Sequence, residues 1–159
     1  MRVDQETVSP VASRSFQIEL RTTPERSRLM SRVRQKGTTL EAIVETILVK
    51  TSASHEQNVV GLPGTPDFAD KLGKWAIFAN GCFWHGHKCR LGRLPKSNSK
   101  FWKSKIVANR ARDRKNADEL KKLGYSILTI WGCETSERVA LTTKVERFLQ
   151  AISHGGDKK

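Results

Sequence analysis

The 159-residue sequence predicts an α/β domain with a mixed central sheet flanked by helices. Apolar residues recur at helical spacing near both ends of the chain, which indicates amphipathic helices. Between them, the runs WAIF and YSILTIW are typical of buried strands. The predicted order is two helices, three β segments, a helix, a strand and a helix, which suits a single layered domain of about 150 residues.

Two helices are predicted before the sheet. The first begins at TTPE, residues 22–25, where a Thr cap, a Pro and a Glu suit a helix start, and it ends at Gly37. The second begins at Thr38 or Thr39 and runs through LEAIVETILVK. Its apolar side chains repeat at helical spacing and are predicted core residues: Leu40, Ile43, Val44, Ile47 and Leu48. Glu41 lies off that stripe.

The middle of the chain is expected to form β structure. A short strand is predicted at Asn58–Val60, followed by the rigid segment GLPGTPDFAD. A turn at residues 71–74 contains a glycine, and it leads into an apolar strand at Trp75–Phe78.

The last third of the sequence alternates helix, strand and helix. A long helix, or two joined helices, is predicted from about Asn98 to Gly124, and a buried strand at Tyr125–Trp131. Thr135 or Ser136 is expected to cap the final helix. Residues 22–153 are predicted to form the folded domain, with a flexible arm at 1–21 and a disordered tail at 154–159.

Charge indicates a polyanionic partner. The chain has 29 Lys and Arg against 16 Asp and Glu, a net charge of +13. Residues 86–122 hold 13 of the basic and three of the acidic residues, enough to release counterions from a nucleic acid. Arg110, Arg112 and Arg114 are candidate DNA-binding residues in this stripe. A solvated helix face is the alternative, and no Trp/Leu anchor helix supports a membrane surface.

No secretion signal or apolar run of roughly 20 residues is present, so a cytoplasmic location is expected. Without a signal peptide, three cysteines favour metal or thiol chemistry over disulfides. Cys82, His87 and Cys89 are spaced C-x4-H-x-C, and Cys133 directly follows a predicted strand. Together they predict a closed Cys3His zinc site of structural type. Three unlinked buried cysteines are the alternative.

The same loop holds residues that this zinc site does not use. His85 would be held rigidly beside the ligands, as a general base must be, although a lone histidine is more often structural. Phe83 and Trp84 suit stacking on bases or insertion between them, with ordinary core packing as the alternative. Asp67, in a Pro-Asp pair before a hairpin, suits Mg²⁺ binding beside a phosphodiester, although the same dipeptide is common in turns.

Five blocks carry a resemblance to a known family: TTPERSRLMSRVR followed by TTLEAIV, LPGTPDFAD, IFANGCFWHGHKC and FWKSKIVANRARDRKNADELKKLGYSILTIWGC. In order and spacing the chain resembles, from about Thr22 to Glu146, the very-short-patch repair (Vsr) endonucleases. These bacterial enzymes nick DNA beside a T:G mismatch and have a variant of the PD-(D/E)XK, or restriction-endonuclease-like, fold.

The resemblance implies roles for individual residues. Asp67 matches the metal-binding carboxylate, Glu41 an active-site glutamate, and His85 the histidine that serves the attacking water or the metal-bound water. The structural zinc ligands match Cys82, His87, Cys89 and Cys133. Residues inserted into the base stack match Met30, Phe83 and Trp84.

The chain departs from the family pattern at two places. Ala79-Asn80 stands where the family has Thr-His. Ala79 could still offer its backbone carbonyl to Mg²⁺, but Asn80 cannot carry a proton at neutral pH. We therefore expect slower cleavage, a different division of labour with His85, or another substrate. Gly86 also replaces a bulkier residue.

The leading hypothesis is a monomeric, Mg²⁺-dependent DNA endonuclease with a structural zinc, acting on mismatched double-stranded DNA alongside mismatch-repair or restriction-modification proteins. A related alternative is a restriction, homing or defence endonuclease that cuts intact DNA. A second class is a zinc-containing DNA-binding module with lost or weakened catalysis. The third is a zinc-stabilised RNA-binding protein.

Overall fold

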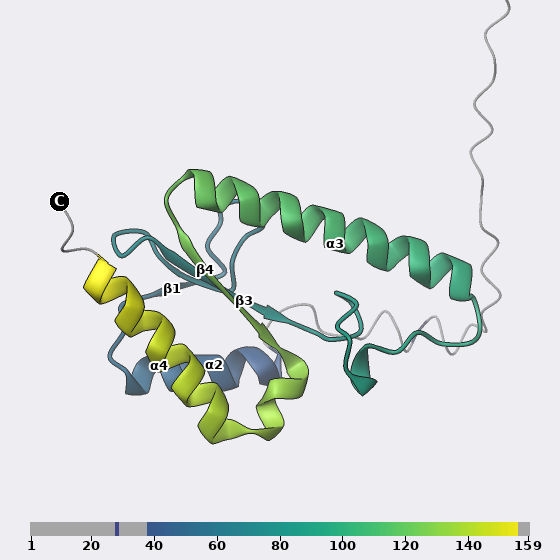
Figure 1. Ribbon diagram of the computed structural model, residues 1–159, viewed down its shortest axis with the longest axis horizontal. Helices are drawn as coiled ribbons and strands as arrows, with labels where there is room; N and C mark the ends of the chain where they lie inside the picture. Colours follow the sequence, from purple (N-terminus) through teal and green to yellow (C-terminus); the bar gives the residue numbers. More distant parts are fainter. Residues whose placement is uncertain (1–27, 29–37, 156–159) are drawn as a thin grey trace, which may run out of the picture.

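A computed structural model of the chain describes Arg28 and residues 38–155. Its centre is one four-stranded sheet in the order β1-β2-β3-β4 (Figure 1). The antiparallel pairs β1/β2 and β2/β3 are followed by the parallel pair β3/β4, so the predicted mixed α/β architecture is confirmed. The strands are β1 (Glu56–Gln57), β2 (Phe68–Asp70), β3 (Trp75–Asn80) and β4 (Ser126–Trp131).

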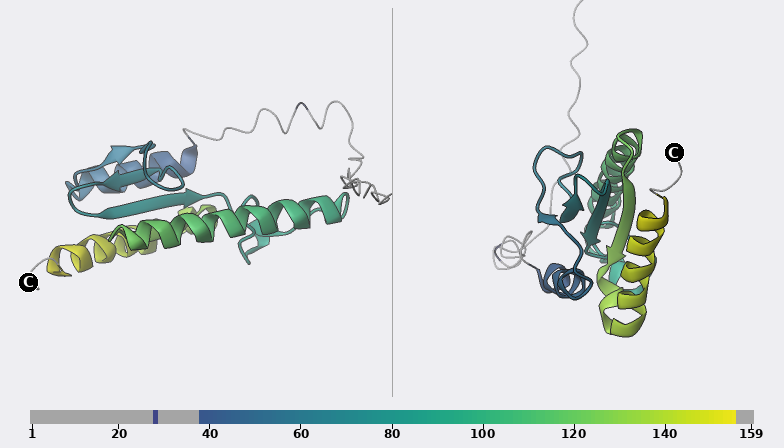
Figure 2. Two further views of the ribbon diagram at one scale, coloured as in Figure 1. Left: turned by 90° about the horizontal axis from the view of Figure 1, so that it is seen from above. Right: turned by 90° about the vertical axis from the view of Figure 1, so that its left-hand side faces the viewer.

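Helices cover both faces of the sheet. One face carries α2 (Thr39–Lys50) and α4 (Arg138–Gly155), and the other carries the 24-residue α3 (Ser99–Lys122) (Figures 1 and 2). Two 3-10 turns, Arg90–Gly92 and Gly132–Ser136, lie near one end of the sheet. No helix within 38–155 is long and apolar enough to cross a bilayer. The predicted first helix with Met30, the arm 1–21 and residues 156–159 lie outside the described residues, apart from Arg28.

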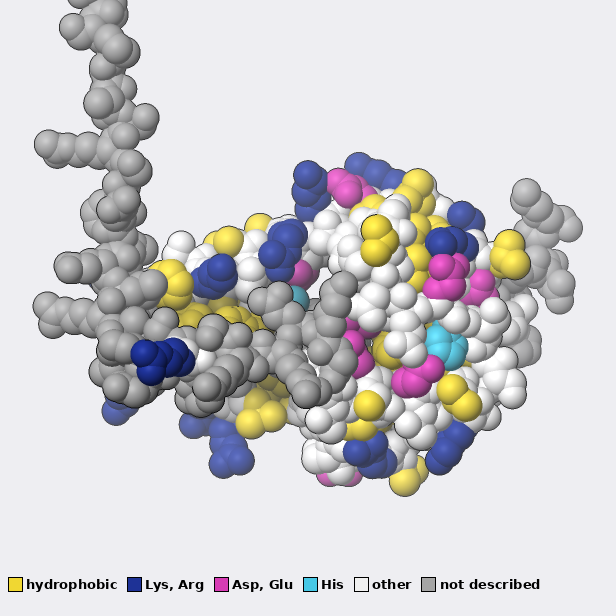
Figure 3. Space-filling model, turned by 180° about the vertical axis from the view of Figure 1, so that it is seen from behind, with side chains coloured by type: hydrophobic (Ala, Val, Ile, Leu, Met, Phe, Trp, Pro, Cys, Tyr) yellow, Lys and Arg dark blue, Asp and Glu magenta, His cyan; other side chains and the backbone are white. Residues whose placement is uncertain are grey.

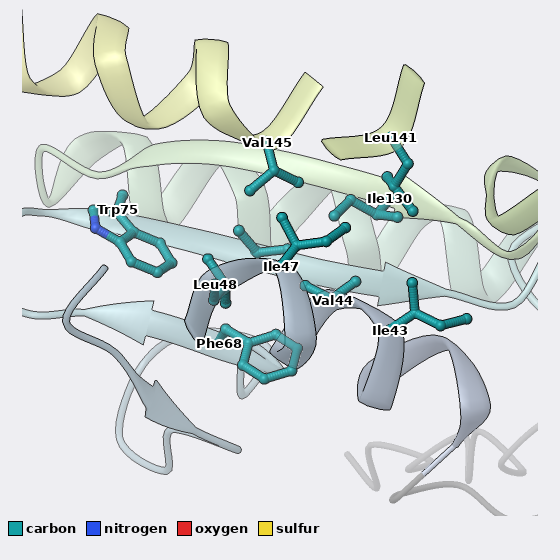
Figure 4. Close-up of a cluster of buried hydrophobic side chains, with 10 residues drawn as sticks. Ile43, Val44, Ile47, Leu48, Phe68, Trp75, Ile130, Leu141 and Val145 are labelled. Carbon is teal, nitrogen blue, oxygen red and sulfur yellow. The ribbon is translucent and has the colours of Figure 1, made fainter. Parts of the chain in front are cut away.

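The period-2 alternation of β3 divides the core between the two faces. Trp75 and Ile77 pack with α2 and α4, whereas Ala76 and Phe78 pack toward α3. Figure 4 shows the first cluster, in which side chains of α2 and α4 meet those of the strands. The predicted core residues of α2 are confirmed as buried or packed against this cluster. Each such aliphatic side chain contributes about 1.5–3 kcal/mol by leaving water.

A capping pair fixes the start of α2. The Glu41 N–H donates to Thr38 Oγ1 at 3.3 Å, and the Thr38 N–H donates back to Glu41 Oε1 at 3.2 Å. The start at Thr38 or Thr39 is therefore confirmed. The same pair holds the Glu41 carboxylate at the N-terminal end of α2.

The strand predicted at Asn58–Val60 is wrong. The strand β1 lies earlier, at Glu56–Gln57, because Asn58 takes a left-handed conformation with φ of 46° that ends the extended chain. Asn58 and Val59 instead donate backbone hydrogen bonds to Asp67 and Pro66 at 2.8 and 3.0 Å. Val59, expected within that strand, is buried in the core cluster that faces α3.

The predicted cap of the final helix is also wrong, because α4 begins at Arg138. Thr135 and Ser136 donate their hydroxyl hydrogens to the carbonyls of Gly132 and Cys133 at 2.8 and 3.0 Å. These hydroxyls stabilise the 3-10 turn that follows β4. The turn fixes Cys133 before the helix starts.

Candidate active site and metal centre

The chemically active side chains gather where the parallel strands β3 and β4 end. The loop 81–89 follows β3, and Cys133 follows β4 within the 3-10 turn. Because carboxyl ends of parallel strands meet at one edge, segments far apart in sequence are brought together there. Along β3, burial changes from complete at Trp75–Ile77 to partial at Phe78–Asn80.

Four side chains, which we call the cysteine cluster, offer a ligand set for a metal ion: Cys82, His87, Cys89 and Cys133. Their sulfur and nitrogen atoms all lie within 4.8 Å of one another. A tetrahedron around zinc, with Zn–S bonds of about 2.3 Å, has edges of about 3.8 Å, so small side-chain shifts would close the set. The cysteines form no disulfide. This cluster could hold a metal ion of the thiolate-binding kind.

Hydrogen bonds inside the cysteine cluster set the charge of its thiols. Desolvation by itself would raise the pKa of Cys89, but hydrogen bonds with His87 and Cys82 outweigh it and lower the pKa to about 6. Desolvation and the neighbouring thiols raise the pKa of Cys133 to about 12. Three thiolates so close together repel one another, so a cation is needed to hold them all ionised.

His85 sits beside this cluster on a tight turn. The His85 N–H donates to the Gly81 carbonyl at 3.2 Å, and the Asn109 side-chain amide of α3 donates to the Trp84 carbonyl at 2.8 Å. His85 Nδ1 lies 2.6 Å from Asp113 Oδ2, also on α3. A carboxylate can only accept, so Nδ1 donates and Nε2 is the ring nitrogen left to accept a proton.

Asp67 lies at the same edge of the sheet, directly before β2. Its Oδ2 accepts from the backbone N–H of Ala79 at 2.7 Å, which ties the carboxylate to the end of β3. Desolvation raises the pKa of Asp67, as does the nearby Glu41, while the Ala79 hydrogen bond and His85 lower it. The net shift is upward. Asp67 is thus a half-buried carboxylate within electrostatic reach of both Glu41 and His85.

An open cavity of about 340 Å³, which we call the His85 cavity, lies between α3 and the strand ends. Asn80 and Trp131 line it from the sheet, His85 from the loop, and Asp113 and Arg110 from α3. Trp131 stacks flat on His87, with ring centroids 4.4 Å apart, and His87 both lines the cavity and belongs to the cysteine cluster. Apolar surface of this lining is combined with a few convergent polar groups, as in sites that bind and orient a ligand.

Phe83 and Trp84 are not isolated on the loop. Together with two rings of the first turn of α3 they form the aromatic cluster: Phe83, Trp84, Phe101 and Trp102. Trp102 lies 5.0 Å from Phe83 and 6.0 Å from Trp84, centroid to centroid. All four rings are half-buried. The sequence motif FWK at the start of α3 was the available signal for the two added rings.

The three candidate arginines of α3 have different surroundings. Arg110 lines the His85 cavity, Arg112 lies 3.9 Å from Asp113, and Arg114 is exposed. Figure 3 shows dark-blue Lys and Arg side chains interspersed with yellow hydrophobic ones over the end of the molecule that holds the start of α3. Asp113 was missed in the sequence, although it is one of only three acids among the 13 basic residues of 86–122.

Known proteins are similar to this chain over much of its length. The family profile described as DNA mismatch endonuclease Vsr matches residues 18–91. A Xanthomonas oryzae pv. oryzae protein named Type II nicking enzyme V.XorIIP is 41% identical over 130 residues, covering 81% of this chain and 96% of the relative.

Two further relatives are similar over most of their length. Type II nicking enzyme V.NmeAIP of Neisseria meningitidis is 35% identical over 131 residues, covering 82% of this chain and 94% of its own. The DNA mismatch endonuclease Vsr of Escherichia coli K12 is 34% identical over 117 residues, or 74% and 75% of the two chains. The resemblance predicted from the sequence blocks is confirmed, and the chain belongs to the Vsr family of DNA endonucleases.

Proposed function

We propose that this chain is a Mg²⁺-dependent endonuclease that nicks one strand of duplex DNA beside a T:G mismatch. The observation that carries the proposal is the pairing of His85 with Asp113 at 2.6 Å, at the sheet edge that also holds Asp67. An imidazole oriented by a carboxylate is a general base, and a second carboxylate nearby suits a hard cation. This arrangement is consistent with the restriction-endonuclease-like fold implied by the resemblance.

The residues that would hold Mg²⁺ are Asp67 and the backbone carbonyl of Ala79, with Glu41 accepting from water molecules. Two observations support this set. Ala79 and Asp67 are joined by a hydrogen bond, and desolvation together with the Glu41 charge raises the pKa of Asp67, which a cation would reverse. When bound, the ion supplies a Lewis acid that polarises the phosphate and lowers the pKa of water.

His85 would take the proton from the attacking water. Asp113 holds Nδ1, which leaves Nε2 facing away from that bond and able to accept. Asp113 also stabilises the imidazolium that forms. Asn80 would orient the phosphate by donating from its amide, because an amide transfers no proton at neutral pH.

The cysteine cluster would hold zinc and act structurally. Its four donors fill a tetrahedral ion, so no position remains for water. An ion there would connect the loop 81–89 to the 3-10 turn after β4. It would thereby hold in place His85, Phe83 and Trp84, which all lie on this loop.

The aromatic cluster supplies a means of preferring mispaired DNA. Phe83 and Trp84, backed by Trp102, would insert into the base stack, and Met30 is proposed to insert as well, although it lies outside the described residues. Separating stacked bases costs a few kcal/mol, and a mismatch lowers that cost. Exposed Arg112 and Arg114 would contact the DNA backbone.

The deciding experiment is a nicking assay with Mg²⁺ on matched and T:G-mismatched duplexes of the same sequence. We expect a single-strand break beside the mismatched T, a much slower reaction on the matched duplex, and none with Asp67→Ala. Equal nicking of both duplexes would reject mismatch recognition. Tight, salt-sensitive binding without nicking in Mg²⁺ or Mn²⁺ would reject catalysis.

The relatives supply a specific reason to keep one second candidate. Two of those compared carry the name Type II nicking enzyme, which supports an association with restriction-modification proteins. Under this alternative the chain nicks intact DNA at a defined sequence. A panel of matched duplexes with varied sequences would show nicking at one site in each susceptible duplex.

A further inference from the structure

We infer that Arg110 is a catalytic residue that binds the reacting phosphate in the His85 cavity, and that the absence of a side chain at Gly86 lets it reach there. The inference rests on the proposed endonuclease function and adds a named cation to its site. This role is assigned to Arg110 and not to Arg112 or Arg114, because those two arginines do not line the cavity.

The position of Arg110 on α3 places it beside the His85 cavity. Arg110 precedes Asp113 by three residues on α3, so the two side chains share a helix face. Asp113 bonds His85, and Arg110 lines the same cavity as His85 and Asn80. A phosphate within reach of His85 Nε2 would therefore lie within the range of the long Arg110 side chain.

The charged groups of the cavity lining also favour Arg110. Asn80 and Thr129 line the cavity with neutral groups, and Asp113 is held by His85 and lies 3.9 Å from Arg112. Arg110 is exposed and forms no ion pair with any residue in the described part of the chain. Lys88 is the other cation of the lining, but it lies on the loop between two members of the cysteine cluster. Among the described residues that line the cavity, Arg110 is therefore the cation that lies on α3 without an ion pair.

Gly86 lies in close contact with α3 next to Arg110. Gly86 has φ of 63°, and a Cβ there would overlap Ile106 Cγ2 and lie 3.4 Å from Arg110 Cδ. Because residue 86 is a glycine, the loop backbone packs directly against α3. The aliphatic part of Arg110 lies along that backbone and is guided toward the cavity.

Hydrolysis of a phosphodiester needs a cation beside the reacting phosphate. Water adds to phosphorus, the bond from phosphorus to the sugar oxygen breaks, and that oxygen leaves with the electron pair and gains a proton from a solvent water molecule. His85 takes the proton of the attacking water. Negative charge increases on the phosphoryl oxygens during the step, and neutral Asn80 cannot offset it. Arg110 transfers no proton, and its forked guanidinium neutralises two oxygens at once.

The first test measures single-turnover nicking with the full chain in excess over DNA. Arg110→Ala is expected to lower the rate at saturation by about 100-fold, the usual loss of one charge-stabilising donor. Arg110→Lys should recover part of it. Arg147→Ala, an exposed arginine on α4 across the sheet, is the matched control and should nick like the parent. Equal rates for Arg110→Ala and the control overturn the inference.

The second test needs no catalysis. Duplexes with single neutral methylphosphonates at successive positions are bound to the parent, Arg110→Ala and Gly86→Ala in Ca²⁺. At one position the parent should lose affinity about tenfold, whereas Arg110→Ala should lose nothing further. Gly86→Ala should behave like Arg110→Ala, with metal content reporting an intact fold.

The two tests separate the inference from the function on which it rests. Nicking by the parent without any such coupled position overturns the role of Arg110 and leaves the endonuclease proposal standing. A coupled position in a parent that does not nick supports the phosphate contact and rejects catalysis.

Discussion

The cysteine cluster and the His85 cavity adjoin at His87, which belongs to the cluster and also lines the cavity, yet the two sites are built for opposite purposes. The cluster packs four soft donors within 4.8 Å and offers no place for water. The cavity is open, about 340 Å³, and His85, Asp113 and Arg110 bring polar groups to it. One loop of nine residues serves both, so the closed site can give rigidity to the open one.

Because the two sites differ in this way, substitutions in the cysteine cluster and in the His85 cavity should have different effects. Changes to the cluster should affect stability first and activity as a consequence. Changes to the cavity should affect rate without altering stability. His87 belongs to both sites, so a substitution there should affect both stability and rate. The same double effect at a residue of one site alone would show that the two sites do not act separately.

The largest effect is expected from Cys133→Ser. Removing one of four ligands should release the metal and cost several kcal/mol in the free energy of unfolding, because ligand binding energy contributes directly to folding in such sites. Nicking should fall with it. Metal content and urea unfolding measure the change, and Ser126→Ala, at the exposed first residue of β4, is the control. Unchanged stability, or no zinc in the freshly purified parent, would remove the structural role.

His85→Ala should do the reverse. We expect a loss of about 1,000-fold in single-turnover nicking, within the range of general base catalysis, and an unchanged unfolding midpoint. His55→Ala provides the comparison, because His55 bonds Glu45 away from the cavity. A His85→Ala variant that nicks as fast as the parent would exclude the proposed base.

The carboxylate of Asp67 is expected both to make the stability of the fold depend on pH and to be required for nicking. Its pKa is raised in the folded state, so between 3.8 and that higher value the folded chain binds more protons than the unfolded chain. Stability therefore falls as pH rises through this window. Asp67→Asn keeps an oxygen for the Ala79 N–H and removes the charge. It should abolish nicking yet be more stable than the metal-free parent at pH 7.

Urea unfolding at pH 4 and pH 7, with and without Mg²⁺, measures the Asp67 effect. The advantage of Asp67→Asn should shrink at the lower pH, and Mg²⁺ should stabilise only the parent. A variant less stable than the parent at pH 7 would show that the carboxylate is held for packing.

Several parts of the fold were accessible from sequence because their causes are local. The helix α2 combines an apolar stripe with the Thr38–Glu41 capping pair, and both lie within a few residues. The strand β4 is an apolar run that ends at a glycine. In contrast, β1 was misplaced because the left-handed turn at Asn58 is stabilised by backbone bonds from Asn58 to Asp67 and from Val59 to Pro66, which lie nine and seven residues away.

In the candidate site, too, the residues set by local spacing could be predicted from the sequence, and those set by long-range packing could not. The spacing of Cys82, His87 and Cys89 is local, and it could be read directly. Asp113 could not, because its bond to His85 spans 28 residues and depends on how α3 packs on the loop. Trp102 was missed for the same reason. The sequence contains these residues but not the helix position that gives them partners.

The smallest effect is expected in the aromatic cluster, which neither site contains. Trp84→Ala should lower the preference for T:G over matched duplex by about tenfold, since stacking on a base contributes about 1–3 kcal/mol, while non-specific binding changes little. Trp84→Phe keeps a ring and should retain most of the preference. Because Phe83 and Trp102 flank Trp84 at 5.1 and 6.0 Å, they can still insert, so the loss should be partial. A Trp84→Ala variant that weakens both duplexes equally would assign the cluster to packing, and mismatch preference would then have to arise elsewhere.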